Sequence, residues 1–313
     1  MKIKSIKKID YRGDVYNLRI KSDDGLNHNY FANGINVSNC HKIKSASIKS
    51  ILDKCFHTAY KIGVSGTLSK EGTLDRLTYM ASTGPVVYEV SAAYLQSKGH
   101  VSDCKVFITY LDYADQEKKE AFYNISRSQF EKSKLFNLEQ QFIIANSKRL
   151  RYISDIISKI KGNSLVLFYH VQYGKDIYNE LRRICDKKVY YVDGGTDKNA
   201  RELYKKKAEE GDDVIIVASF GTFSTGISIN KIHNIFLTES FKSEVIIRQS
   251  IGRGLRLHSS KDRVNIIDFV DDFRFKIPDS NRTFKNYIFR HGEHRKKIYE
   301  EQQFEYVERY HKI

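Results

Sequence analysis

The second half of this 313-residue chain contains a series of short apolar segments, most of them separated by helical patterns, and this alternation constrains the fold more than any other feature. The segments are Ser164–Tyr169, Val189–Val192, Val214–Ser219, Asn234–Leu237 and Val264–Phe269. Strands that are apolar throughout are buried on both faces, and alternation with helices is typical of parallel strands. We therefore predict an α/β fold with a mostly parallel sheet that is covered by helices.

The first 39 residues have a different pattern, which is typical of short strands. Asp14–Ile20 alternates apolar and polar residues with period two, and Asn33-Gly34 lies between extended segments, which predicts a two-residue hairpin. Farther along, Ser45–Phe56 has a helical pattern and Tyr60–Val64 reads as a strand. The chain therefore looks like a small β segment followed by an α/β protein.

The composition favours a polyanionic partner. Lysine and arginine outnumber acidic residues by 53 to 38, a formal net charge of +15, which points to nucleic acid; a basic surface without a partner is the alternative. The four cysteines (Cys40, Cys55, Cys104 and Cys185) lack the paired spacing of a zinc site or a disulfide framework. No apolar run could span a bilayer and no signal-peptide core is present, so we expect a cytoplasmic protein with no membrane partner.

The Asn39-Cys40 pair can carry out acyl chemistry at a peptide bond. An Asn side-chain nitrogen can attack its own backbone carbonyl and close a succinimide, which cleaves the bond after it. A cysteine that directly follows can accept an acyl group, because thiolates are good nucleophiles. Alone, such a pair is usually a loop dipeptide, so its neighbours decide the interpretation.

Those neighbours resemble a known family. The string from His28 to Cys40, HNYFANGINVSNC, resembles the C-terminal splicing block of inteins over its whole length, and Val15–Leu18 fits an upstream strand of that family. The resemblance implies a Hint-type β segment in which Asn39 cyclises. It also implies that Cys40 is the first extein residue and the acyl acceptor, and that His28 assists at the junction. A turn histidine bonded to backbone is the alternative for His28.

Two positions depart from the commonest pattern of the family: Ser38 replaces the usual penultimate His, and Asn27 precedes His28 where an Asp is frequent. The half of an intein that carries the first nucleophile does not occur before residue 28. We therefore expect residues 1–39 to be the C-terminal half of a split intein, with an N-terminal half as partner. A fragment of a contiguous precursor is the alternative.

Three strings in the rest of the chain resemble motifs of superfamily 2 helicases, in the order in which those enzymes carry them. They are Ser65-Gly66-Thr67 for motif III, residues 218–228 (ASFGTFSTGIS) for motif V, and Gln249–Arg256 (QSIGRGLR) for motif VI. The resemblance implies an ATP-driven motor with RecA-like lobes, in which the motif III string couples the ATP and DNA sites. It also implies that Thr225 and Gly226 touch the DNA backbone and relay its presence to the nucleotide.

Motif VI is the most specific of the three. Its spacing predicts that Gln249, Arg253 and Arg256 lie along one side of a helix. Two guanidinium groups there can reach a γ-phosphate across a cleft, as an arginine finger does, so these residues are candidates for ATP hydrolysis. A solvated helix face is the ordinary alternative for such an arginine pair.

Cys40-His41 completes another helicase motif once the first 39 residues are removed. A superfamily 2 helicase needs an Asp-Glu-x-His motif II shortly before motif III, and Cys40-His41 stands at the right distance before Ser65. The partner is therefore expected to end in Asp-Glu before its intein half, so that His41 is the remnant of motif II. No GxxxxGK[ST] loop occurs in the sequence, so we expect ATP and Mg²⁺ as cofactors of the spliced product and no ATP hydrolysis by the chain alone.

The overall resemblance, over residues 40 to about 313, is to phage UvsW-type DNA helicases, and it implies remodelling of branched DNA in recombination and repair. The expected domains are the split-intein segment 1–39, the end of the first lobe at 40–105, the second lobe with motifs IV–VI at 106–275 and a basic helical tail at 276–313. A non-catalytic nucleic-acid-binding lobe with a degenerate intein remnant is the alternative. A neighbouring reading frame that ends in Asp-Glu and an N-terminal intein half would discriminate between these interpretations.

Overall fold

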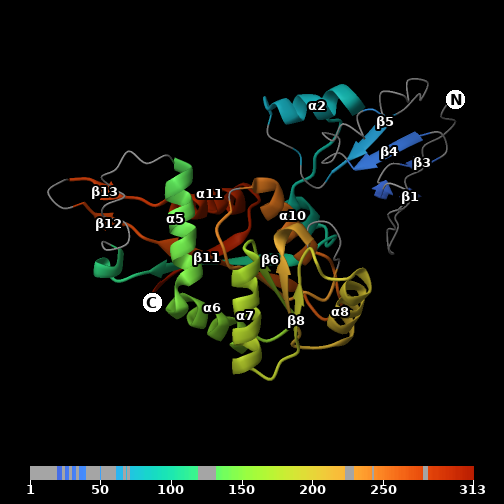
Figure 1. Ribbon diagram of the computed structural model, residues 1–313. Coiled ribbons are helices and arrows are strands. Elements are labelled where there is room, and N and C mark those ends of the chain that lie inside the picture. Colours follow the sequence, from blue (N-terminus) through green and yellow to red (C-terminus); the bar gives the residue numbers. More distant parts are fainter. Residues whose placement is uncertain are drawn as a thin grey trace. The chain divides into compact units, whose positions relative to one another are not determined.

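The computed structural model in Figure 1 describes residues 20–22, 25–27, 30–32, 35–39, 50, 61–65, 68, 71–118, 132–222, 229–241, 243–277 and 281–313. For the strands between residues 20 and 39 it describes the backbone alone. Contacts divide the chain into two compact units, Met1–Glu89 and Val90–Ile313, which we call unit 1 and unit 2. The lobe boundaries expected at residues 105 and 275 stay predictions.

Unit 2 is built around a seven-stranded sheet in the order β14-β6-β11-β10-β7-β9-β8, and all neighbouring pairs in it are parallel. The strands are β6 (Asp103–Asp112), β7 (Ser164–Phe168), β8 (Val189–Val192), β9 (Ile215–Ser219), β10 (Asn234–Leu237), β11 (Arg263–Asp272) and β14 (Glu305–Lys312). The predicted α/β fold with a mostly parallel sheet is therefore confirmed.

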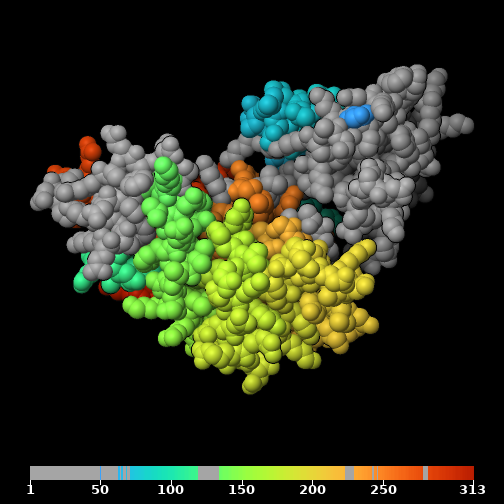
Figure 2. All heavy atoms as spheres, viewed as in Figure 1, coloured from blue at the N-terminus to red at the C-terminus, as the bar shows by residue number. Residues whose placement is uncertain are grey.

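Helices cover both faces of this sheet. They are α3 (Ala92–Ser97), α5 (Lys132–Ala145), α6 (Ser147–Lys159), α7 (Val171–Ile184), α8 (Lys198–Glu210), α10 (Glu244–Gly254) and α11 (Tyr287–Glu301). Leu165 and Leu167 of β7 lie in a core with residues of α8, α10 and α11, whereas Val166 and Phe168 lie in a core with residues of α5, α6 and α7. This period of two is the reason why β7 is apolar throughout. In Figure 2, α5 and α7 (green to yellow-green) hide the sheet behind them.

The end of the chain differs from its helical prediction. Helix α11 ends at Glu301, and β14 then pairs with β6 from Glu305 opposite Lys105 to Lys312 opposite Asp112. The turn between them has Gln303 at φ 56° and buries Phe304. The tail is helical only in part, because its last residues satisfy their backbone hydrogen bonds along β6.

A short hairpin of β12 (Phe275–Lys276) and β13 (Thr283–Phe284) precedes helix α11.

Helix α11 is fixed on the sheet by a buried ion pair. Arg295 of α11 is fully buried and donates to both carboxylate oxygens of Asp268 on β11, with Nη2–Oδ1 and Nε–Oδ2 distances of 2.8 Å. Tyr299 donates to the same carboxylate at 2.8 Å. These bonds fix the position of α11 on β11.

Unit 1 contains helix α2 (Leu74–Thr83), a strand pair of β1 (Ile20–Ser22) and β2 (Gly25–Asn27), and a sheet in the order β3-β4-β5. The strands of that sheet are β3 (Tyr30–Ala32), β4 (Ile35–Asn39) and β5 (Lys61–Val64). β3 and β4 are antiparallel with Ala32 opposite Ile35, which confirms the hairpin predicted around Asn33-Gly34, two residues outside the described ones. β5 confirms the predicted strand and runs parallel to β4.

Of the helix predicted at Ser45–Phe56, the structure describes Ser50 alone, which is helical, and the other residues lie outside the described ones. In the part of the chain that the structure describes, no helix is both long and apolar enough to cross a bilayer.

Candidate nucleotide and nucleic-acid site

The topology of unit 2 places a switch point at the carboxyl ends of β7 and β10. These two strands are neighbours, yet the chain leaves β7 toward β8 on one side of the sheet and leaves β10 toward β11 on the other side. In open α/β sheets, ligands bind outside the carboxyl ends of the strands at such a switch point. The residues that follow Phe168 and Leu237 are therefore the first candidates for a site.

A buried carboxylate joins these two strand ends. Glu239 follows β10 and is fully buried; its Oε1 accepts the backbone N–H groups of Tyr169 (2.8 Å) and His170 (3.0 Å), which follow β7. Its Oε2 is hydrogen-bonded to Nδ1 of His170, and this bond is the main cause of the raised pKa of the half-buried imidazole. An anionic partner favours the charged form of a histidine. The turn after β7 is thus held in one position by Glu239.

That turn presents an aromatic ring to solvent. Tyr169 is 62% exposed and meets His170 in an edge-to-face contact, with ring centroids 5.2 Å apart. An exposed ring beside an imidazole that is readily protonated suits a nucleic acid, because bases stack on aromatic faces and phosphates attract cations. The pattern of residues did not reveal this pair, although Tyr169 is the last residue of a predicted buried strand and His170 directly follows it.

A second buried ion pair contacts the end of β10. Arg149 of α6 binds both oxygens of Asp271 on β11, with Nε–Oδ1 at 2.6 Å and Nη2–Oδ2 at 2.9 Å, and donates to the Thr238 carbonyl at 2.8 Å and to the Tyr173 hydroxyl. Tyr113 donates to Asp271 at 2.6 Å. Asp271 raises the pKa of Arg149 against the opposing effect of burial. Since these groups are fully buried, we assign them to fixing α6 and the end of β10 and not to binding a ligand.

The motif V string begins at the end of β9, the strand on the other side of β7. Ser219 donates to the hydroxyl of Thr222 at 2.8 Å, and Thr222 is buried. Thr225 and Gly226, the residues expected to touch DNA, lie outside the described residues. The structure therefore brings the start of motif V to the same sheet edge as Tyr169 and His170, and the roles of Thr225 and Gly226 stay predictions.

Motif VI is helical only in part. Gln249 and Arg253 lie one turn apart on α10, and both are half-buried, but the helix ends at Gly254, before Arg256. The expectation that one helix side carries all three residues is therefore wrong for Arg256. The helix end is closely packed, since a Cβ on Gly254 would lie 2.6 Å from Cδ1 of Ile235.

The segment after α10 is tied down by backbone contacts. Ser102 donates its backbone N–H to the Leu255 carbonyl (2.8 Å) and its hydroxyl to the Arg256 carbonyl (3.2 Å). The buried ammonium of Lys261 donates to the carbonyls of Gly254 (2.6 Å) and Ile232 (2.7 Å), and burial lowers its pKa to about 8. These bonds fix the backbone after the helix, and Arg256 itself is exposed.

The splicing candidates lie in unit 1. The backbones of Ser38 and Asn39 form the end of β4, and the half-buried Ser65 follows β5. The other candidates of this unit lie outside the described residues: His28, Cys40, His41, Gly66 and Thr67. The roles predicted for all of them stay predictions.

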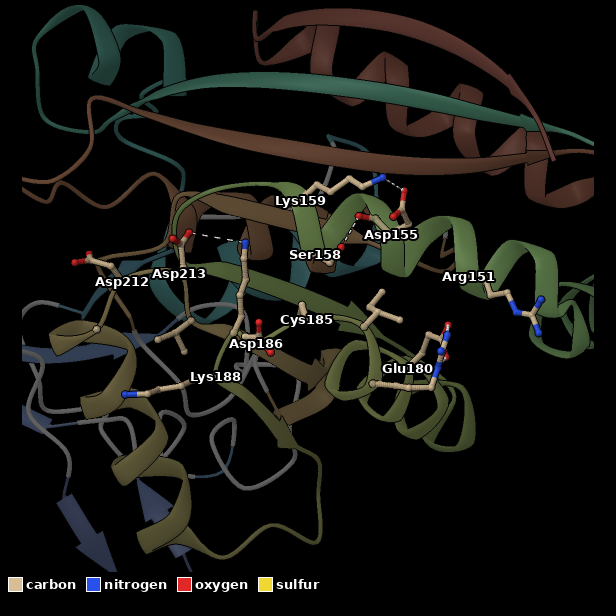
Figure 3. Close-up of a pocket in the computed structure, with 15 residues that line it drawn as sticks. Arg151, Asp155, Ser158, Lys159, Glu180, Cys185, Asp186, Lys188, Asp212 and Asp213 are labelled. Carbon is tan, nitrogen blue, oxygen red and sulfur yellow. Dashed lines mark hydrogen bonds and ion pairs between the residues drawn. The ribbon is translucent and has the colours of Figure 1, made fainter.

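A cavity of about 910 Å³ opens at the amino ends of strands in unit 2, near the starts of β8 and β9 (Figure 3). Its charged walls pair with each other: Lys159 with Asp155 at 2.6 Å, Arg183 with Glu180 at 2.6 Å, and Lys187 with Asp213 at 3.8 Å. It lies away from the carboxyl ends of β7, β9 and β10 and from α10. Among the described residues, no group of three or more His, Cys, Asp or Glu is placed to hold a metal ion.

No family model matches the chain. Among curated proteins, the ATP-dependent DNA helicase uvsW of Enterobacteria phage T4 is 34% identical over 275 residues, which cover 86% of this chain and 52% of the phage protein. The chain is homologous to that helicase. The crystal structure of T4 UvsW is similar to 88% of this chain at 31% identity, with a TM-score of 0.56, over 52% of the UvsW chain.

A fragment of an HsdR subunit of a type I restriction enzyme from Vibrio vulnificus has a TM-score of 0.58 over 86% of this chain and 47% of its own, at 15% identity, and so shows the fold alone. The homology to UvsW confirms that the helicase-like part of the chain is related to the UvsW type of helicase, as its motif strings predict. This chain spans about half the length of T4 UvsW.

Proposed function

We propose that this chain is the C-terminal precursor of an ATP-dependent DNA helicase that is assembled by protein splicing in trans and acts on branched DNA. The observation that carries the proposal is the position of the Asn39–Cys40 bond, at the end of an intein-like block and at the start of a helicase-like sequence. The alignment to UvsW, 275 residues, is about as long as residues 40–313, the part that the proposal assigns to the helicase.

Splicing in this proposal uses three residues of the chain. Cys40 attacks the thioester at the end of the partner's helicase segment, and the partner's own thiol leaves. Asn39 then closes a succinimide with its side-chain nitrogen, and the amine of Cys40 is the leaving group, which His28 assists. That amine attacks the adjacent thioester, the sulfur leaves, and a peptide bond remains. One acyl group is passed from atom to atom, so the reaction requires no ATP.

For ATP hydrolysis, this chain supplies the second-lobe part of the site. Arg253 on α10, with Gln249 one turn before it, is suited to bind the γ-phosphate as charge develops there, and Arg256 is assigned the same role from the loop beyond the helix. The phosphate loop and the motif II carboxylates have to come from the partner, since the 313 residues hold no GxxxxGK[ST] string. ATP and Mg²⁺ are therefore cofactors of the joined protein.

The proposal assigns the DNA contacts to residues that follow the carboxyl ends of β7 and β9. Tyr169 provides a stacking surface, His170 an imidazole beside it whose bond to Glu239 raises its pKa, and Thr225 and Gly226 contacts to the backbone. The formal charge of +15 suits phosphate contacts, which supply most sequence-independent affinity. The preference for branched DNA comes from the resemblance to the UvsW type.

The test is to mix the chain with an N-terminal partner that ends in Asp-Glu and an N-terminal intein half, without ATP. We expect a ligated product that contains Cys40 and lacks residues 1–39, seen by intact mass. Asn39→Ala should block release of residues 1–39 and let a branched species accumulate, whereas Cys40→Ala should abolish ligation. A ligated product that retains residues 1–39 would show that the junction is misplaced.

A further inference from the structure

We propose that β4 holds the place of the strand that splicing puts in front of Cys40, so that splicing exchanges one strand for another beside β5. The inference rests on the proposed splicing function, and it adds the structural consequence of the reaction for the helicase part. It concerns the sheet β3-β4-β5 of unit 1, whose backbone is described.

The first observation is the register between the two strands. β4 runs parallel to β5, with Asn36 opposite Lys61 and Asn39 opposite Val64. β4 is therefore paired on both edges, with the intein-like strand β3 on one side and the helicase-like strand β5 on the other. The scissile bond follows the last residue of this pairing, and Ser65 of the motif III string follows its partner.

The second observation is the connection between the two strands. Residues 40–60 join β4 to β5, and parallel neighbours require a crossover of such a kind. This connection lies entirely after the junction, so splicing keeps it and changes only the segment before Cys40. Because residues 40–60 lead to β5 both before and after splicing, the proposal places the new segment before Cys40 at the same edge of β5.

The register then fixes where the partner's residues go. The partner's last residue takes the position of Asn39, opposite Val64, and the residue before it takes that of Ser38. If the partner ends in Asp-Glu, these two residues come to lie opposite Gly63 and Val64, at the end of the strand next to β5 and directly before the level of Ser65. In the precursor this edge is already covered by β4, which also protects an edge strand from wrong pairing.

The experiment locates β4 with a pair of cysteines in the full chain. Val37→Cys with Ile62→Cys occupies partnered positions, where neighbouring strands lie about 4.8 Å apart and a disulfide can form. Val37→Cys with Val64→Cys is the matched control, displaced by two residues along β5. After mild oxidation, peptide mapping should find the 37–62 link at several-fold higher yield than the 37–64 link. Equal yields, or neither link, would overturn the inference.

A second arm tests the exchange itself. The linked chain, mixed with the partner, should ligate and keep residues 1–39 attached through the 37–62 disulfide. This product should lack DNA-stimulated ATP hydrolysis until a reductant frees β4, and should then reach the rate of the unlinked product. Full activity before reduction would refute the exchange. Failure of the unlinked wild-type chain to ligate would instead refute the splicing function, while the cysteine yields would still decide where β4 lies.

Discussion

Replacement of Arg149 by methionine should lower the free energy of unfolding of unit 2 by about 3–5 kcal/mol, the usual cost of breaking a buried ion pair from one side. The guanidinium is fully buried, and Asp271, its partner, is 1% exposed. Without Arg149, the Asp271 carboxylate keeps the Tyr113 hydroxyl as a donor, and the Thr238 carbonyl loses the Arg149 bond. Methionine fills similar space, so the expected loss is mainly electrostatic.

Two further variants separate the buried charge from other effects. Lys159→Met removes a cation from the same helix, but Lys159 is 72% exposed and its partner Asp155 is 53% exposed, so the cost should be below about 1 kcal/mol. The double variant Arg149→Met with Asp271→Asn removes both buried charges. It should be more stable than Arg149→Met alone by about 2 kcal/mol or more, because no unpaired charge remains.

The assay is urea unfolding followed by far-UV circular dichroism and tyrosine fluorescence, since the chain has 21 Tyr and no Trp. Unfolding midpoints at equal slopes give the differences in the free energy of unfolding. A cost for Arg149→Met no larger than that for Lys159→Met would refute the assignment of the Arg149–Asp271 pair as a buried structural element.

Three other predictions concern function. In the spliced product, Arg253→Ala should lower kcat by on the order of 10³-fold and leave DNA affinity and its salt dependence unchanged, whereas Arg248→Ala, whose side chain pairs with Glu244 and Glu301, should leave kcat nearly unchanged. Tyr169→Ala should weaken binding of single-stranded DNA by about 1–3 kcal/mol in a fluorescence titration, with Tyr169→Phe nearly neutral. The pKa of His170 is raised in the folded protein, so protonation of His170 stabilises the fold. This stabilisation is complete at a pH below the unfolded pKa of about 6.5 and is lost as the pH rises through the folded pKa. Glu239→Gln should remove this pH dependence of the free energy of unfolding, as measured by urea titrations at several pH values.

The central strands could be predicted from the sequence because burial on both faces leaves an unmistakable apolar run. β10 has its predicted bounds, and β7 differs by one residue at its end. β14 could not be predicted in this way, because it is an edge strand whose side chains are mostly exposed. Its contacts are non-local: Tyr310 stacks on Tyr110 with ring centroids 4.7 Å apart, far away in the sequence. A local pattern carries no information about such a partner.

The candidate site was predicted only where a string of residues is local. Gln249 and Arg253 lie on one helix as their spacing predicts, but that helix ends at Gly254, and nothing in the spacing of Arg256 reveals this. The Glu239–His170 bond joins residues from two separate strand ends and so could not be predicted from the sequence. Asp268 and Asp271 did leave a signal, since two carboxylates within an apolar strand require buried cationic partners.

The splicing block and the helicase-like sequence meet at Cys40, and this coincidence sets an order of events in the proposed function. The arginines that would stabilise the transition state stand in this chain, whereas the carboxylates that would hold Mg²⁺ stand in the partner. Proximity alone does not complete motif II, because its Asp-Glu and its Cys-His belong to different chains until the new peptide bond forms. ATP hydrolysis therefore has to follow splicing, and the bond made at Cys40 is at once the product of one reaction and a precondition of the other.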